Sequence, residues 1–141
     1  MKTIELDLEV FKVAAQKVPA DGPVFMLNLL RYRDRALYEG RPDESPCSGR
    51  EAYHQRYLPT FQRLAASTDY KLIFFGSVLA KLVGPEGAQW DDVAIVEYAS
   101  YAEFCGVVDS ERYREEANHH RLAALEDFRL FVTNKQNIGA D

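Results

Sequence analysis

Cysteines, long apolar runs and clusters of positive charge are all scarce in this chain of 141 residues. Two cysteines, Cys47 and Cys105, are too few for a disulfide framework. Nowhere do the roughly 18 consecutive apolar residues of a membrane-spanning helix occur. The formal net charge of -5 argues against binding to a nucleic-acid backbone. Because the first residues also lack the apolar run of a signal peptide, we expect a cytoplasmic protein.

The motifs of several common enzyme classes are missing as well. The sequence has no G-x-S-x-G elbow, no Walker loop and no G-x-G-x-x-G, so hydrolase, nucleotide and dinucleotide sites are not predicted. It has no H-x-x-x-H and no paired C-x-x-C, and the adjacent His119 and His120 cannot both face one ion from a regular helix. We therefore expect neither a metal site nor a cofactor.

Two capping boxes mark the starts of two helices. Ser48 with Glu51, and Ser100 with Glu103, have the spacing at which a serine caps the third helical N–H and a glutamate returns to the serine N–H. Each box lies between runs of strand-forming residues. The predicted order is therefore strand, helix, strand, strand, helix, strand. That is the ferredoxin-like split βαβ order, an α+β fold whose antiparallel sheet carries both helices on one face.

Hydrophobic patterning places the individual elements. We predict strands at 24–32, 70–83, 90–98 and 130–133, with helices at about 8–18, 48–64, 101–108 and 110–125. Pro59 lacks a backbone N–H and should kink its helix. The polar segment 33–47 is expected to be a lid or a flexible loop.

The length suits one domain with one core. We expect residues 1–141 to form this single domain, with an extra N-terminal leader helix in 1–22, the ferredoxin-like core in 23–133 and a tail in 134–141. Apolar residues occupy both alternating faces of the first two strands, so the sheet face without helices would expose a large apolar patch. A second copy is the predicted cover, which gives a homodimer packed sheet on sheet through about 800 Å² per partner.

Three segments resemble a known family: 26–32 (MLNLLRY), 93–98 (VAIVEY) and 120–130 (HRLAALEDFRL). They are similar to the domain-of-unknown-function family numbered thirteen-thirty, a member of the dimeric alpha+beta barrel superfamily. The resemblance covers about 24–132 and implies a dimeric α-β barrel with a cleft between its sheet and helices. Relatives in the superfamily include cofactor-free monooxygenases, haem-degrading enzymes, lactone isomerases and simple ligand binders, so the resemblance implies no single reaction.

Three polar residues on otherwise apolar faces are the candidate catalytic groups. His120 shares a helical face with Tyr113 and should point inward, where it could be a base or donor, or a packed histidine. Asn28 interrupts an apolar strand and must either bond within the sheet or face a ligand. Arg31, at the end of the same strand, could belong to an anion clamp or lie in solvent.

Other residues are candidates for ligand binding. Glu97 is predicted in the central strand, where it is either a catalytic carboxylate or the partner of Arg31 or Arg129 in a buried ion pair. Aromatic side chains could shape the walls, with core packing as the alternative. These are Tyr53, Trp90, Tyr98 and Tyr113.

The sequence therefore leaves three functions open. The first is binding of a small, partly apolar organic molecule, which the protein could also transform by proton transfer or cofactor-free oxidation. The second is a non-catalytic ligand-binding or assembly domain. The third is a haem-handling enzyme that uses Asn28, Trp90 and His120. Partners beyond a second copy and a small ligand, such as nucleic acid or a membrane, are not expected.

Overall fold

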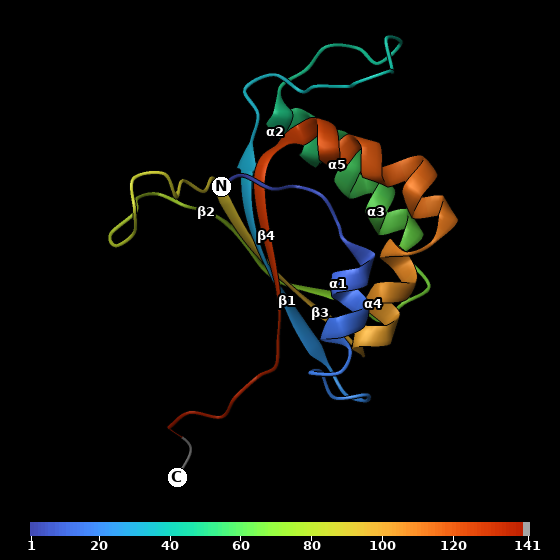
Figure 1. The fold of residues 1–141 in the computed structure, drawn as a ribbon, viewed down its shortest axis with the longest axis vertical. Coiled ribbons are helices and arrows are strands. Elements are labelled where there is room, and N and C mark those ends of the chain that lie inside the picture. The colour runs from blue at the N-terminus through green and yellow to red at the C-terminus, as the bar shows by residue number, and fades with distance from the viewer. Residues whose placement is uncertain (140–141) are drawn as a thin grey trace.

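The computed structural model describes residues 1–139 and has two layers, a curved sheet and a layer of helices (Figure 1). Its strands are β1 (Val24–Tyr32), β2 (Lys71–Ser77), β3 (Asp92–Tyr98) and β4 (Leu125–Thr133). The strand order is β2-β3-β1-β4 and every pairing is antiparallel. The predicted ferredoxin-like α+β fold is confirmed. Residues 140 and 141 of the predicted tail lie outside the described residues.

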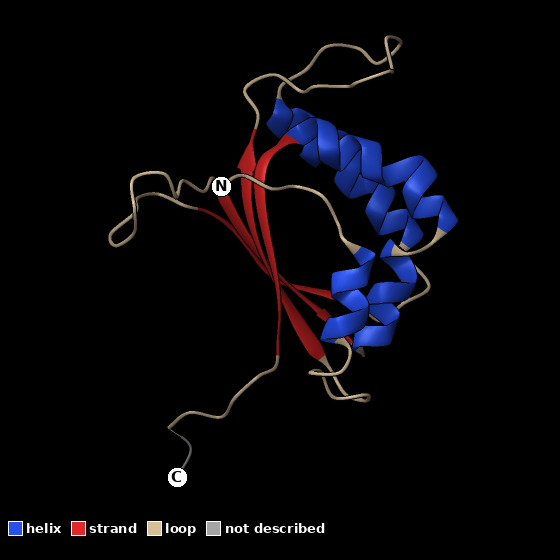
Figure 2. Ribbon diagram, viewed as in Figure 1, coloured by secondary structure: helices blue, strands red, loops and turns tan. Residues whose placement is uncertain are grey.

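All helices cover the same face of the sheet, as Figure 2 shows. They are α1 (Leu8–Ala14), α2 (Gly49–Glu51), the π-helix η1 (Ala52–Tyr57), α3 (Leu58–Leu64), α4 (Tyr101–Val108), the π-helix η2 (Tyr113–Ala117) and α5 (Asn118–Ala124). None of these described helices is long and apolar enough to cross a bilayer.

The serine caps start the helices where the sequence predicts. Ser48 forms a complete box, in which its Oγ accepts from the Glu51 N–H at 3.0 Å and the Glu51 carboxylate accepts from the Ser48 N–H at 2.8 Å. Ser100 accepts from the Glu103 N–H at 3.1 Å. The helix around Pro59 is irregular, because the π-helix η1 ends at Tyr57, two residues before this proline. There Leu58 N–H bonds to the Tyr53 carbonyl, five residues back.

Two strand boundaries differ from the prediction by more than two residues. β2 ends at Ser77 and not at 83, because the chain beyond leaves the sheet as an irregular hairpin loop. In that loop Leu79, Leu82 and Val83 are more than 90% exposed. No layer of the described residues 1–139 therefore covers these apolar side chains. β4 begins at Leu125 and not at 130, directly after α5.

A bulge in β2 also changes which side chains face the helices. The register with β3 shifts between Leu72 and Phe74, so the strict alternation predicted for this strand is wrong. Leu72 and Phe75 both lie on the helix side of the sheet. Ile73 and Phe74, each about half exposed, lie on the opposite side, which we call the outer face.

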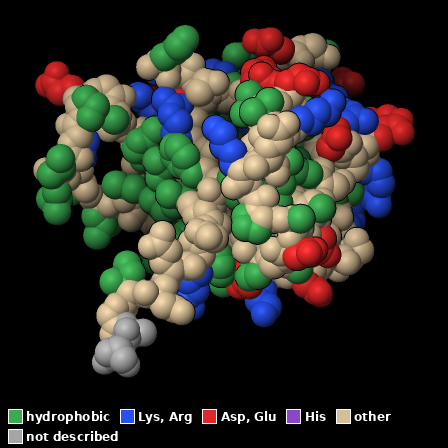
Figure 3. Space-filling view, turned by 60° about the horizontal axis from the view of Figure 1, so that its bottom comes forward, with side chains coloured by type: hydrophobic (Ala, Val, Ile, Leu, Met, Phe, Trp, Pro, Cys, Tyr) green, Lys and Arg blue, Asp and Glu red, His purple; other side chains and the backbone are tan. Residues whose placement is uncertain are grey.

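The outer face carries an apolar row that crosses all four strands. The directly paired residues of this row are, in order, Phe74, Ile95, Leu27 and Phe131. Phe74 and Phe131, on the edge strands, are 53% and 50% exposed. Figure 3 shows hydrophobic side chains gathered on the side of the molecule away from the helices (Figure 3).

Candidate functional site

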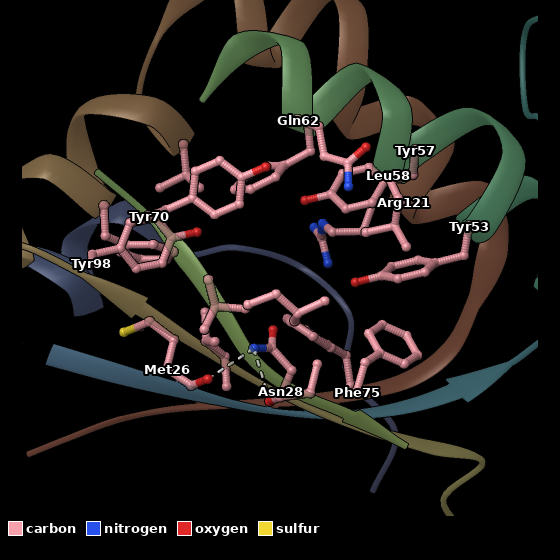
Figure 4. A pocket seen from close by; sticks show the side chains of 18 of the residues that line it. Met26, Asn28, Tyr53, Tyr57, Leu58, Gln62, Tyr70, Phe75, Tyr98 and Arg121 are labelled. Carbon is pink, nitrogen blue, oxygen red and sulfur yellow. Dashed lines mark hydrogen bonds between the residues drawn. The ribbon is translucent and has the colours of Figure 1, made fainter. Parts of the chain in front are cut away.

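A cavity of about 110 Å³ lies between the sheet and the helices (Figure 4). The sheet contributes Met26, Asn28 and Ala94 to its floor, and η1, α3, η2 and α5 form the roof. Its lining is mostly aromatic and aliphatic and includes no aspartate, glutamate, lysine or histidine. A concave, mainly apolar space with a few polar groups is typical of a small-molecule site.

Five tyrosines belong to the lining: Tyr53, Tyr57, Tyr70, Tyr98 and Tyr113. Three of them come from the two π-helices, which are rare elements often found at functional sites. Burial raises the pKa of Tyr53, Tyr57 and Tyr98. These hydroxyls therefore stay protonated at neutral pH and act as donors or acceptors without a charge.

Asn28 lies on the sheet side of the cavity. Its amide nitrogen donates to the carbonyl oxygens of Met26 at 3.2 Å and Ala94 at 3.4 Å. These bonds fix the side-chain amide, and Figure 4 shows its oxygen turned toward the cavity. The bonds within the sheet considered for Asn28 are therefore present, and its oxygen faces the open space of the cavity.

Arg121 is the one charged residue of the lining, and the sequence pattern did not indicate it. Its side chain, on α5, is only 2% exposed. The guanidinium donates to the Ile4 carbonyl at 2.6 Å and to the Asn118 side-chain oxygen at 3.1 and 3.3 Å. It also lies over the Phe128 ring at 5.3 Å. Among the described residues, no acidic side chain forms an ion pair with it.

The π-helix η2 explains why Arg121 and not His120 faces the cavity. In a regular helix His120 would share the face of Tyr113, but a π turn holds about one extra residue. That insertion rotates the following residues by about 100°, one position in an α-helix. Arg121 therefore takes the inward position, and His120 instead bonds through Nδ1 to the Tyr38 hydroxyl at 2.7 Å, outside the cavity.

His119 and His120 both contact the segment 33–47. Their ring centroids are 4.0 Å apart, and His119 Nε2 lies 3.9 Å from a carboxylate oxygen of Glu44. The three side chains could place ligand atoms within 4.8 Å of one another, which is a spacing compatible with a metal. Arg41 disfavours positive charge on both histidines and Arg56 disfavours it on His120, whereas Glu44 favours it on both.

The segment 33–47 is held to the body of the protein by backbone bonds. Arg33 and Leu37 donate to the carbonyls of Ala124 and Ala123, each at 2.9 Å.

Burial, with a smaller contribution from His120, lowers the pKa of His119 to about 4. Burial also lowers the pKa of His120. Both imidazoles are therefore neutral at pH 7.

Besides His120, four of the predicted site residues lie outside the cavity. Arg31 and Glu97 are on the outer face of β1 and β3. Arg129 pairs with Asp127 at 2.6 Å, and its guanidinium lies over the Trp90 ring at 5.2 Å. No ion pair of Glu97 is found among the described residues, so the predicted pairing with Arg31 or Arg129 is absent there.

A second polar cluster, also missed from the sequence, lies beside the cavity. Asp92 is 1% exposed and accepts from the Tyr32 hydroxyl at 2.5 Å and from Arg50 at 3.0 Å. His54 Nε2 is 3.0 Å from the same hydroxyl. Burial alone would raise the pKa of Asp92, but the hydrogen bond from Tyr32 and the charge of Arg50 outweigh it and lower that pKa. Asp92 is therefore an ionised, structurally anchored carboxylate.

Comparison with known proteins gives a family but no activity. No protein-family model matches the chain, and no curated protein matches it significantly. A crystal structure of the methylated RPA0582 protein superposes with a TM-score of 0.85 and 34% identity, covering 99% of this chain and 98% of that one. A second structure, of the RPA0582 protein of unknown function from Rhodopseudomonas palustris, superposes with a TM-score of 0.77 and 36% identity. The match covers 98% of this chain and 100% of that one. The chain therefore belongs to the same uncharacterised family as the RPA0582 protein.

Proposed function

We propose that this protein binds a small, mainly apolar organic molecule in the cavity between its sheet and its helices. The observation that carries the proposal is the cavity itself, about 110 Å³ in volume and lined by aromatic and aliphatic side chains. An apolar cavity of about 150 Å³ is enough to hold benzene. The expected ligand is therefore about the size of a single ring or a short branched chain.

We propose binding and not catalysis, because two of the three candidate catalytic groups, His120 and Arg31, are not at the cavity. His120 bonds to Tyr38 on the loop side of α5, and Arg31 lies on the outer face of the sheet. Asn28 alone of the three borders the cavity. His120 could transfer a proton only to a substrate bound outside this cavity.

A haem-handling function is not supported by this arrangement. Asn28 lines the cavity, but Trp90 and His120 do not. A space of about 110 Å³ is also smaller than the roughly 300 Å³ at which pockets for drug-sized ligands begin, and haem is larger than such ligands.

We further propose that the protein is a homodimer packed through its outer face, as the resemblance to dimeric alpha+beta barrels implies. Support comes from the apolar row of Phe74, Ile95, Leu27 and Phe131, which crosses all four strands. An exposed patch of this kind is typical of an interface. A two-fold axis would place the same row of a second copy against it. The helices and the cavity would then lie on the outside of each subunit.

Cavity binding is tested by titrating the protein with toluene, benzyl alcohol and benzoate and following backbone amide chemical shifts. We expect saturable shifts at Asn28, Tyr53 and Tyr98 with at least one probe. Ala94 lies in the cavity floor and is 4% exposed, so Ala94→Leu should fill the space and weaken binding about tenfold or more. Ala66→Leu, at an exposed alanine, is the matched control. Binding that is absent, or unchanged in Ala94→Leu, would contradict the proposal.

A further inference from the structure

Arg121 places a permanent positive charge at a cavity that holds no negative one. Its side chain is 2% exposed, and the rest of the lining is neutral. A guanidinium does not lose its proton in proteins. The tyrosines around it cannot supply the missing charge, because burial raises the pKa of Tyr53 and Tyr57 and both keep their protons.

The hydrogen bonds of Arg121 are incomplete in a specific way. A guanidinium has five N–H groups. Nε and Nη2 donate to the Asn118 side-chain oxygen, and Nη1 donates to the Ile4 carbonyl. One N–H on each terminal nitrogen is left without a partner among the described residues. Figure 4 shows the guanidinium reaching into the space between the Tyr53 hydroxyl and the Tyr57 ring.

Burial of an unpaired charge is costly unless another group compensates it. The bonds to Asn118 and Ile4 orient the guanidinium but provide only neutral acceptors. Arg121 is therefore a buried cation that is already oriented, and it is preorganised for an anion that arrives with the ligand. Two N–H groups on one planar fork match the two oxygens of a carboxylate.

We propose that the natural ligand is a small organic carboxylic acid, bound as its anion by Arg121, with its apolar body among the aromatic side chains of the cavity. This inference rests on the proposed function and specifies the ligand class of the same cavity. A single buried arginine balances a single negative charge, so a monocarboxylate fits better than a dianionic phosphate. The size of the cavity limits the body to about one ring or a short branched chain.

The test compares acids with neutral molecules of the same shape. Benzoate is paired with benzyl alcohol, and 3-methylbutanoate with 3-methylbutanol, in calorimetric titrations of the full chain at pH 7.5. We expect at least one acid to bind about tenfold or more tightly than its alcohol, because charge-assisted bonds to arginine are the stronger ones. This measurement uses the unaltered protein, so it does not depend on the folding of a variant.

Arg121→Met then removes the charge and keeps a side chain of similar length. We expect it to weaken acid binding about tenfold or more while leaving alcohol binding unchanged or tighter. Arg112→Met is the matched control, since Arg112 is exposed and pairs with Glu116 on the surface. It should leave both affinities unchanged.

The outcomes separate the two proposals. Alcohols that bind as tightly as the acids, or acid binding that survives Arg121→Met, would overturn the carboxylate assignment and leave a neutral-ligand cavity. If neither acids nor alcohols bind the unaltered protein, both the ligand class and the binding function are wrong.

Discussion

The hydroxyl groups of Tyr57 and Tyr113 lie 2.7 Å apart, where the π-helix η1 meets the π-helix η2 above the cavity. Both side chains are almost fully buried, at 6% and 1% exposed. One hydroxyl thus donates to the other in a place where water has little access. The bond joins the two irregular helices whose residues form much of the cavity roof.

This pair should show coupling in a double-mutant cycle. Tyr57→Phe or Tyr113→Phe alone leaves one buried hydroxyl without its partner and should lower the free energy of unfolding by about 1 to 2 kcal/mol. The double variant should cost about 1 kcal/mol less than the sum of the two. Chemical denaturation of the four proteins measures this. Strict additivity would mean that the hydroxyls do not stabilise each other.

Gly49 should tolerate no side chain. A Cβ there would meet the carbonyl oxygens of Arg33 and Ala124, the latter at 2.5 Å, and both belong to backbone that cannot move freely. We expect Gly49→Ala to cost about 3 kcal/mol or more in unfolding free energy. Gly106→Ala is the matched control, because a Cβ at this position in α4 meets nothing within 4 Å. It should stabilise the protein by about 0.5 to 1 kcal/mol, since alanine favours a helix over glycine. Similar effects at the two sites would contradict this account.

Asp92 should matter more to stability than an exposed aspartate. Asp92→Asn removes the charge that accepts from Tyr32 and Arg50 and should cost about 2 kcal/mol. Asp109→Asn breaks only an exposed ion pair with Arg114 and should change stability by less than about 1 kcal/mol. Because folding lowers the pKa of Asp92, the ionised carboxylate contributes to the free energy of unfolding at neutral pH. This contribution is lost as the pH falls below the ordinary range of a carboxyl group. Urea titrations at pH 7 distinguish the two variants.

The two adjacent histidines should make stability depend on mildly acidic pH. The folded protein lowers the pKa of His119 from 6.5 to about 4, so the unfolded chain binds more protons in this interval. The contribution of neutral His119 to the free energy of unfolding is largest above pH 6.5 and declines as the pH falls toward 4. His119→Gln should flatten the change in unfolding free energy between pH 6.5 and 4.5. An unaltered slope in this variant would exclude His119 as the cause.

A charge on the outer face should disrupt the proposed dimer without unfolding the subunit. Phe131→Glu places a carboxylate in the apolar row, where Phe131 is 50% exposed in the subunit. Sedimentation should show a dimer for the unaltered protein and a subunit-sized species for the variant. Val13→Glu is the control, since Val13 is 57% exposed on α1, on the helix side of the sheet. A monomeric unaltered protein would contradict the dimer.

Local patterns were sufficient for much of the fold. Ser48 and Ser100 fixed the starts of two helices, because capping depends only on residues within one turn. β1 was predicted with its observed bounds from a run of apolar residues. The end of β2 was missed because Leu79, Leu82 and Val83 have strand-like side chains but no layer to pack on. Whether an apolar residue is buried depends on distant parts of the chain.

The site was predicted less well, for a physical reason that Arg121 illustrates. Helical periodicity assigned the inward position to His120, and an α-helix throughout would have placed it there. The π-helix η2 moved that position by one residue. A π turn leaves no clear mark in sequence, so no local pattern could have identified Arg121.

By itself the sequence determined the order of elements, the helix starts and the apolar character of both sheet faces, since each depends on neighbouring residues. Only the tertiary structure decided which polar side chains face the cavity. The inward position of Arg121, the distance of His120 from the cavity and the burial of Asp92 all result from contacts between residues far apart in the chain. Burial and charge compensation are properties of that packing, and one-dimensional spacing does not encode them.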